Sequence, residues 1–469
     1  MLSQLIRKEI LQHLMSLRFA IACVLCLVVI LCSIFVRSRD YSQLLDDYGQ
    51  ESAMAREQLD GVGHPWAFAM QVYSRPNPMK ILVRGVTDAN GGSVRVSPGD
   101  PLEPDFPQPN NPAATLFPSI DMVTFVGVIM SLLAIVFGYD AVCGEKQQGT
   151  LRLMLSYSVP RHLVLVSKWI GGYVTLILPF LLTVLVGVVL VMTRPDVSLT
   201  SGQWARLSGI VVMALVYVAA VLSMAIYVSC LTRRSATCVM LLLSLWAVLV
   251  LVIPNLSPHL ARMLRPTPGA LGVEDQRIAK ERDIRQGVRQ KISTWREKNN
   301  NTETDRMKRQ YEQRKFSVRA HGEGWVDTLN AWEKIDEPRR RRMDAQVRLS
   351  RWIGRASPFT CFAMAATELA DAGVMHERRL WQQLRDFQVE LTEYGTDEYV
   401  ALLDKELAAG GNRVDWRHNR QKPLPVFGYS PAAGWDYWKA VSVDAGILAA
   451  MTVVLFLLSY VAFLRYDVR

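Results

Sequence analysis

The side chains that commonly carry out chemistry are scattered along this chain. Cys23 and Cys26 have the C-x-x-C spacing of a metal or redox pair, but no second pair of ligands accompanies them. None of the seven histidines forms a spaced pair with a cysteine or a carboxylate cluster: they are His13, His64, His162, His259, His321, His376 and His418. We therefore predict no catalytic residue, no metal site and no cofactor bound by this chain.

Motifs for several classes of enzyme and carrier are missing from the sequence. It has no G-x-x-x-x-G-K-[ST], H-E-x-x-H or G-x-S-x-G, so the chain has no P-loop with which to hold a nucleotide. Its long apolar segments carry almost no ionisable groups, whereas ion-coupled carriers need them within the membrane. Asp140 and Asp444 lie only at segment ends. These absences argue against a self-powered enzyme or a secondary transporter.

One stretch, residues 139–168, is organised for a specific contact. It connects two strongly apolar segments, yet it has about thirty residues where a few turn residues would suffice. Its polar residues are interrupted by Leu151, Leu153, Met154 and Leu155, which give it an apolar side. We predict that this stretch leaves the membrane and forms a helix that lies against another surface.

The elements around this stretch are membrane-spanning helices. A run of about 18 apolar residues with almost no charge is typical of such a helix. Six segments qualify: 19–36, 120–138, 169–192, 207–230, 236–253 and 443–464. Half of the residues are hydrophobic, and the net charge of +10 is explained by Lys and Arg at membrane edges and in charged helices rather than by nucleic-acid binding. The predicted fold class is an all-α polytopic membrane protein.

Basic residues predict the orientation of the spans. Arg233 and Arg234 occupy the very short connection between the fourth and fifth segments, which marks that loop as cytoplasmic. Residues 1–18 are amphipathic and are predicted to form a cytoplasmic interfacial helix; the alternative is a cleaved signal peptide. Both termini are then cytoplasmic, and residues 37–119 and 254–442 lie outside.

The two outer regions differ in predicted structure. The first is expected to be helical to about Asp60 and to be irregular over the proline-rich residues 97–118. Between them, residues 80–86 are expected to pair with residues 93–96 in a hairpin around residues 90–92. The second is expected to contain four charged helices, with breaks at residues 299–301 and 322–324: 274–299, 303–320, 325–355 and 376–407.

Two shorter features lie close to the membrane. The apolar residues 352–369 are too few to span, so they either pack a helix on the outer mouth of the bundle or lie along the interface. Trp435, Tyr437 and Trp438 precede the last span and are typical of an aromatic belt at a membrane surface.

The 139–168 stretch resembles a known signature. Its order of residues is an acidic residue, a small-residue turn, Glu, Gly-Thr-Leu, Ser, Pro and Arg, followed by a Lys before the next span, with Met154 where a Leu is usual. This order resembles the signature of type-2 ATP-binding-cassette (ABC) permeases, and the chain resembles the permeases of copper-enzyme maturation and gliding motility in that family. Six spans and the lack of an ATPase domain fit this family; the large outer regions depart from its simplest members.

The resemblance implies a function and a set of partners. The chain is expected to be an exporter's permease subunit in the bacterial inner membrane, paired with a second permease chain as a homo- or heterodimer. Two copies of a separate ATPase would bind ATP and Mg²⁺, and a periplasmic protein is a further expected partner. The residues expected to couple to the ATPase are Asp140, Glu145, Gly149, Thr150, Leu151, Arg152, Leu155, Ser156, Pro160 and Arg161.

Several residues of the stretch have a specific expected role. Glu145 and Arg152 would make charge-assisted contacts with the ATPase, while Leu151 and Leu155 would be apolar anchors. Gly149 would allow close approach or a sharp turn, and Arg161 and Lys168 would return to the lipid headgroups.

Three alternatives remain open at this point. The stretch could be an interfacial helix without a partner. The chain could be a membrane-anchored interaction protein, or an enzyme acting on lipids or envelope polymers through residues such as His376 and Glu377.

Overall fold

A computed structural model describes residues 2–62, 64–66, 69–85, 93–105, 120–151, 160–267, 269–299 and 306–465. Six of its helical units are long and apolar enough to cross a membrane, which confirms the prediction of an all-α polytopic protein. They are α2 (Leu17–Gly61), the unit α4 (Met122–Thr124), η3 (Phe125–Met130) and α5 (Ser131–Gly138), α8 (Arg161–Met192), α9 (Ser201–Leu231), the unit α10 (Ser235–Trp246), η4 (Ala247–Val252) and α11 (Ile253–Leu264), and α17 (Gly434–Leu464).

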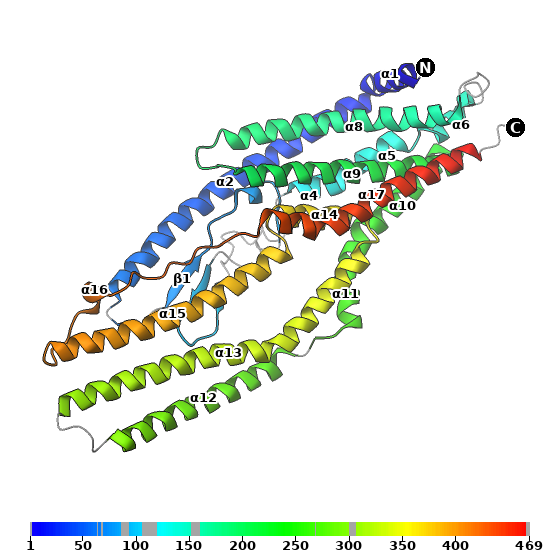
Figure 1. The fold of residues 1–469 in the computed structure, drawn as a ribbon. Helices are drawn as coiled ribbons and strands as arrows, with labels where there is room; N and C mark the ends of the chain where they lie inside the picture. The colour runs from blue at the N-terminus through cyan, green and yellow to red at the C-terminus, as the bar shows by residue number, and fades with distance from the viewer. Residues whose placement is uncertain are drawn as a thin grey trace.

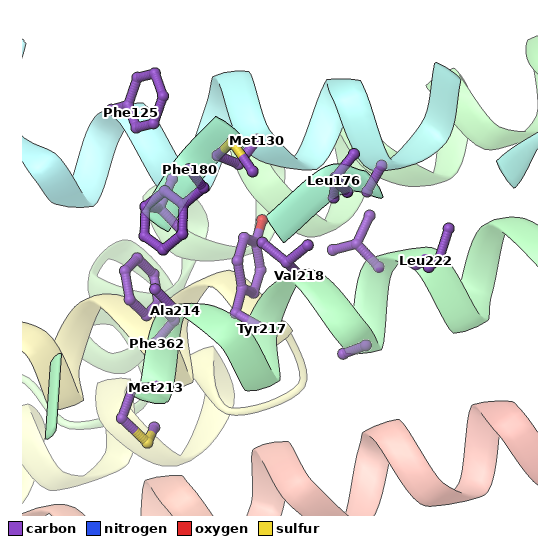
Figure 2. Close-up of a cluster of buried hydrophobic side chains, with 14 of the residues drawn as sticks. Phe125, Met130, Leu176, Phe180, Met213, Ala214, Tyr217, Val218, Leu222 and Phe362 are labelled. Atoms are coloured by element: carbon purple, nitrogen blue, oxygen red, sulfur yellow. The ribbon is translucent and has the colours of Figure 1, made fainter. Parts of the chain in front are cut away.

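Helix α9 is the centre of the bundle. In its most apolar 18-residue stretch 78% of the residues are buried, against 17% in α17 and in the α10–α11 unit. It packs against α17, α5, α8, and α14 (Pro358–Leu369). Figure 2 shows Tyr217 and its neighbours on α9 surrounded by side chains of the other helices. The outer spans therefore expose apolar faces, as helices in contact with lipid do.

A π-helical turn, η3, interrupts the second span beside this core. A π turn disturbs the regular hydrogen bonding of the helix, and here the carbonyl oxygen of Gly127 accepts from Tyr217 Oη at 2.9 Å and from Ser131 Oγ at 2.6 Å. A Cβ on Gly127 would lie 2.1 Å from the Phe359 ring, so glycine is what lets α14 approach η3. Tyr217 also stacks on Phe362 of α14 at 5.3 Å between ring centroids.

The two ends of the molecule are different. Figure 1 shows α1 (Leu2–Leu14), α6 (Cys143–Gln148) and both ends of the described chain at one end of the bundle. At the other end, α2 extends well beyond its apolar part, and the long helices α12 (Ala270–Asn299), α13 (Arg306–Gly354) and α15 (Val374–Ala408) form an elongated domain (Figure 1). The short helix α16 (Trp416–Asn419) lies at the far end of this domain.

A small antiparallel sheet connects the two outer regions. It has the order β1 (Met70–Tyr73), β2 (Ser93–Val96) and β3 (Glu103–Asp105), with Val72 opposite Val94. Val72, Val94 and Val96 are buried in one cluster with Leu384 and Leu391 of α15. The first outer region thus completes the core of the second, because a three-stranded sheet needs a packed apolar face.

The predicted hairpin around residues 90–92 has the wrong partner strand. Residues 93–96 do form a strand, but its neighbours are β1 and β3. The sequence predicts that residues 80–86 pair with this strand, but the 3₁₀ helix η1 (Pro78–Ile81) occupies the start of that segment. Asn77 caps η1, and its side chain accepts from Met79 N. Residues 86–92 lie outside the described residues.

The predicted break at residues 322–324 is also wrong, because α13 continues through them to Gly354. A Cβ at Gly322 would lie 2.2 Å from Thr396 Oγ1 on α15, and one at Gly324 would lie 2.6 Å from Val288 Cγ2 on α12. The two glycines therefore serve close helix packing on opposite neighbours, and the packing offsets their poor helix propensity.

Helix α14 confirms the expectation that the apolar residues 352–369 pack on the bundle. It begins at the cap Ser357, whose Oγ accepts from Thr360 N, and it lies against α9 and α17. Cys361, Phe362 and Leu369 have no exposed surface. Helix α14 connects α13 to α15 along the chain, so both long helices of the outer domain are attached to a helix that packs within the bundle.

Candidate functional site

The structure describes residues 139–151 and 160–168 of the predicted stretch, and the short helix α6 lies in the first of these parts. Its first turn is anchored to α9, because Ser229 Oγ accepts from Val142 N at 3.1 Å and from Cys143 N at 3.0 Å. Gly149 ends the helix with φ of 76°, a left-handed conformation that favours glycine. The predicted sharp turn at Gly149 is confirmed. Residues 147–150 are exposed and form the described tip of the stretch.

A buried lysine joins three elements behind this tip. Lys168 of α8 lies with its Nζ 2.6 Å from Glu145 Oε1 and 3.4 Å from Glu9 Oε1. Its side chain is only 5% exposed, so the expectation that Lys168 reaches the headgroups is wrong. Buried ammonium groups need paired carboxylates, and here α6 and α1 each supply one. A Cβ at Gly171 would lie 2.7 Å from Glu9 Cβ, which shows how closely α1 packs on α8.

Further polar contacts hold the two ends of α6. Arg18 Nη1 lies 2.7 Å from Asp140 Oδ2, and its Nη2 donates to Tyr139 Oη at 3.1 Å. Lys146 Nζ donates to the carbonyl oxygens of Cys230 and Thr232 at the end of α9. Because basic side chains stabilise the carbonyl end of a helix, Lys146 fixes α6 to the loop between α9 and α10.

The structure brings most of the predicted coupling residues to this end of the bundle, in different environments. Glu145 is committed to Lys168, and Leu151 is 1% exposed within this chain. Thr150 Oγ1 donates to Glu145 O at 3.4 Å and is exposed. Pro160 precedes α8, and Arg161 Nη1 donates to Leu464 O at the end of α17 at 3.1 Å. Arg152, Leu155 and Ser156 lie outside the described residues.

This arrangement can bind a surface and transmit movement. The exposed tip carries no group with the geometry of a catalyst, and within the described ranges no three His, Cys, Asp or Glu side chains are grouped to hold a metal ion. Behind the tip, hydrogen bonds and ion pairs connect α6 to α1, α8 and α9. The α6 region is therefore held directly to α8 and α9, and to α1 through Lys168.

A second group of charges was missed by the sequence reasoning. Asp444 of α17 is fully buried; its Oδ2 lies 2.5 Å from Arg351 Nη2 and its Oδ1 lies 2.6 Å from Arg355 Nε. Arg351 Nη1 is also 3.5 Å from Glu368 Oε1, and burial raises the pKa of Glu368 above its ordinary value. The sequence contained a signal for this group. Two arginines four residues apart lie on one face of a helix, where both can pair with a carboxylate at the start of a span.

A third polar group surrounds the turn between α14 and α15. Asp371 has φ of 53° and lies with Oδ1 3.2 Å from His376 Nδ1. Burial raises the pKa of Asp371, but His376, Tyr437 and Arg206 together lower it more, so the net pKa is below its ordinary value. Asn77 Nδ2 donates to Ala370 O at 3.0 Å, so the first outer region is tied to the same turn. The turn is thus a joint between the bundle and the outer domain.

Comparison with known proteins gives a consistent result. A family model described as "ABC-2 family transporter protein" matches residues 3–301. Two curated relatives carry the name "Probable ABC transporter permease protein NosY": one from Stutzerimonas stutzeri is 36% identical over 69 residues, which are 15% of this chain and 24% of the relative. The other, from Pseudomonas aeruginosa, is 28% identical over 99 residues, 20% of this chain and 35% of the relative. The chain thus covers about a quarter to a third of the length of these relatives.

Proposed function

The chain belongs to the ABC-2 family of transporter proteins, and from this premise we propose that it is a permease subunit driven by a separate ATPase through α6 and the residues that follow it. The observation that carries the proposal is the exposed tip of residues 147–150, placed by Gly149 and braced by Lys168. A rigid helix with an exposed end is suited to insertion into a cleft on a partner.

The proposed partners follow from the family and from this geometry. Two ATPase subunits would bind ATP and Mg²⁺, and a second permease chain, identical or different, would complete the membrane unit. Closure of the ATPases on ATP would push on α6, and the ion pairs of Lys168 would pass this movement to α8 and α1. The direction we propose is export.

The outer domain would respond to movement of the spans. Arg351 and Arg355 of α13 bind Asp444 of α17, and α2 continues without a break from its apolar part into the outer region. Stiff helices that cross from one region to the other transmit rotation better than loops do. We propose that the domain works as a lever or gate, or as a dock for a periplasmic protein.

The coupling proposal is tested by co-purification of the chain with the ATPase encoded beside it. Bulky substitutions at the exposed tip, Gln148→Trp and Thr150→Trp, should weaken complex formation and lower ATPase stimulation by about tenfold. Lys298→Trp, at an exposed position at the other end of the molecule, is the matched control. All three should unfold at the wild-type temperature, since none of these side chains is buried. Wild-type complex and activity in both tip variants would overturn the proposal.

The proposed location is the bacterial inner membrane with the α6 end in the cytoplasm. Cysteines introduced one at a time at Gln148 and Lys298 report the two ends. The background carries Cys23→Ser and Cys32→Ser, because Cys32 is exposed and Cys23 is half-buried, whereas the other native cysteines are buried. Cys361 is unsuitable for this purpose because it is buried. In intact spheroplasts an impermeant maleimide should label position 298 and leave position 148 unmodified; the reverse pattern would invert the topology.

A further inference from the structure

A cavity of about 730 Å³ lies where the outer domain meets the bundle. Its walls come from the ends of α13, α14 and α15 that lie nearest the bundle and from Ala440 of α17. This volume is in the range of sites that hold small organic ligands. The cavity adjoins the bound pair Arg351–Asp444 but is not filled by it.

The charges of the cavity are unbalanced. Four arginines and two carboxylates line it. Arg351 is engaged by Asp444 and Glu368, and Arg378 Nη2 lies 2.6 Å from Asp344 Oδ1. Arg348 and Arg379 have no hydrogen-bond or ion-pair partner among the residues that the structure describes.

Arg348 is exposed and Arg379 half-buried, so both guanidinium groups are open to a ligand. Asp386, the second lining carboxylate, is seven residues beyond Arg379 on α15, about 10 Å further along the helix. It also borders a separate hollow lined by residues of α12 and α13. The part of the cavity close to the bundle is therefore cationic.

Besides the polar side chains of Thr367, Gln382 and Gln383, the rest of the wall is mainly apolar. Val347, Met364, Val374 and Met375 contribute hydrocarbon and thioether surface beside the arginines. Methionine adapts to ligands of varied shape because its side chain is unbranched and polarisable. A cavity with two free guanidinium groups and a methionine-rich wall suits a molecule that is anionic at one end and apolar at the other.

Aromatic residues place this cavity at the membrane surface. Trp435 and Trp438 at the start of α17 are 74% and 40% exposed, and Trp352 of α13 is 61% exposed. Exposed tryptophans next to an apolar span are typical of the boundary between headgroups and hydrocarbon. Trp352 is one turn from Arg348, and Trp438 is two residues from the lining residue Ala440.

We propose that this cavity binds an anionic membrane lipid. Arg348 and Arg379 would hold its phosphate, since guanidinium groups donate paired hydrogen bonds to phosphate oxygens. The glycerol and the upper acyl chain would lie against Met364 and Met375. The proposal needs only that the chain spans a membrane; it does not depend on coupling to an ATPase.

The test is a binding titration with the full chain purified in a neutral maltoside detergent. The probes are dioctanoyl phosphatidylglycerol, dioctanoyl phosphatidylcholine of the same chain length, and inorganic phosphate. Phosphatidylglycerol should bind saturably and about tenfold more tightly than phosphatidylcholine, because only the former carries a net charge for the arginines to neutralise. Inorganic phosphate should not compete at millimolar concentration, because it lacks the apolar part.

Substitutions assign the binding to this cavity. The Arg348→Gln/Arg379→Gln double variant should bind phosphatidylglycerol at least about tenfold more weakly, while Arg342→Gln, an exposed arginine on α13 outside the lining, should bind as the wild type does. Neither Arg348 nor Arg379 makes a hydrogen bond or ion pair with another side chain that the structure describes, so unfolding temperatures should change little.

Three results would overturn the proposal. One is equal binding of the two lipids. Another is an unaffected double variant. The third is full competition by inorganic phosphate, which would make the cavity a site for soluble anions instead.

Discussion

Arg351 Nη2 lies 2.5 Å from Asp444 Oδ2 and so joins the outer helix α13 to the last span, α17. Asp444 has no exposed surface, and Arg355 binds its second oxygen. A buried carboxylate in this position is tolerated only because two guanidinium groups neutralise it. The contact fixes the angle at which the outer domain leaves the membrane.

Removal of this carboxylate should destabilise the whole chain. Asp444→Ala leaves two partly buried arginines without their shared partner, and only Arg351 keeps a second carboxylate, Glu368. The cost should be about 3 kcal/mol, the lower end of the range for breaking a buried pair. Thermal unfolding of the purified chain in detergent measures the loss. Arg341→Ala breaks an exposed pair with Glu337 on the same helix, and it should cost less than about 1 kcal/mol. Equal unfolding temperatures for the two variants would contradict this account.

The lysine behind α6 should be more important than either of its partners. Lys168→Met leaves Glu145 and Glu9 facing each other without a cation and should cost about 3 kcal/mol or more. Glu145→Gln should be more damaging than Glu9→Gln, because Glu145 is 2.6 Å from the ammonium group and Glu9 is 3.4 Å away. Chemical unfolding monitored by tryptophan fluorescence ranks the three variants; a Glu9→Gln variant less stable than Lys168→Met would refute the order.

Two helical glycines should respond in opposite directions to the same substitution. Gly322→Ala places a methyl group 2.2 Å from Thr396 Oγ1 and should destabilise the outer domain by about 1–3 kcal/mol. Gly287→Ala on α12 meets no atom within 4 Å and should stabilise by about 0.5–1 kcal/mol through helix propensity. Circular dichroism measures the unfolding temperatures of the two variants. If both temperatures rose or both fell, the packing described for Gly322 and Gly287 would be wrong.

Two substitutions of Asp371 should separate the contribution of its charge to stability from that of its backbone conformation. Asp371→Asn retains a side chain that tolerates positive φ and loses only the charge next to His376. Asp371→Ala loses the charge and also strains the backbone, which should add about 1–2 kcal/mol. The unfolding temperature should therefore be highest for the wild type, lower for the Asn variant and lowest for the Ala variant. An Ala variant as stable as the Asn variant would contradict the role of the backbone conformation.

His64 should make the outer domain less stable in mild acid. Burial lowers the pKa of His64 below 6.5, Arg314 lowers it further, and Glu406 opposes the shift. Its Nδ1 accepts from Trp66 N at 3.2 Å, a contact that only the neutral ring can make. The unfolded chain therefore binds a proton that the folded chain excludes, and stability is lost as the pH falls below 6.5.

The matched variant for this effect is His64→Gln. When the pH is lowered from 7.5 to 5.5, the unfolding temperature of the wild type should decrease more than that of the variant. Parallel losses would assign the pH dependence to other groups, and a larger loss in the variant would reverse the sign.

The sequence by itself determined the class of the protein and singled out the 139–168 stretch. Six runs of apolar residues are sufficient to predict spans because the bilayer imposes one length and one composition on any helix that crosses it. The segment around Gly149 stood out for a similar local reason, since a long polar stretch between two spans has no role in a simple turn. Both inferences depend only on neighbours along the chain.

The tertiary structure decided how charges and glycines are used, because these depend on distant residues. Lys168 is predicted from its neighbours to face lipid headgroups, yet Glu9, more than 150 residues away, and Glu145 draw it into the interior. The sequence around Gly322 predicts a helix break, whereas the structure shows that Thr396 occupies the space where a Cβ would lie. A buried ion pair or a close helix contact is a property of two surfaces, and one stretch of sequence specifies only one of them.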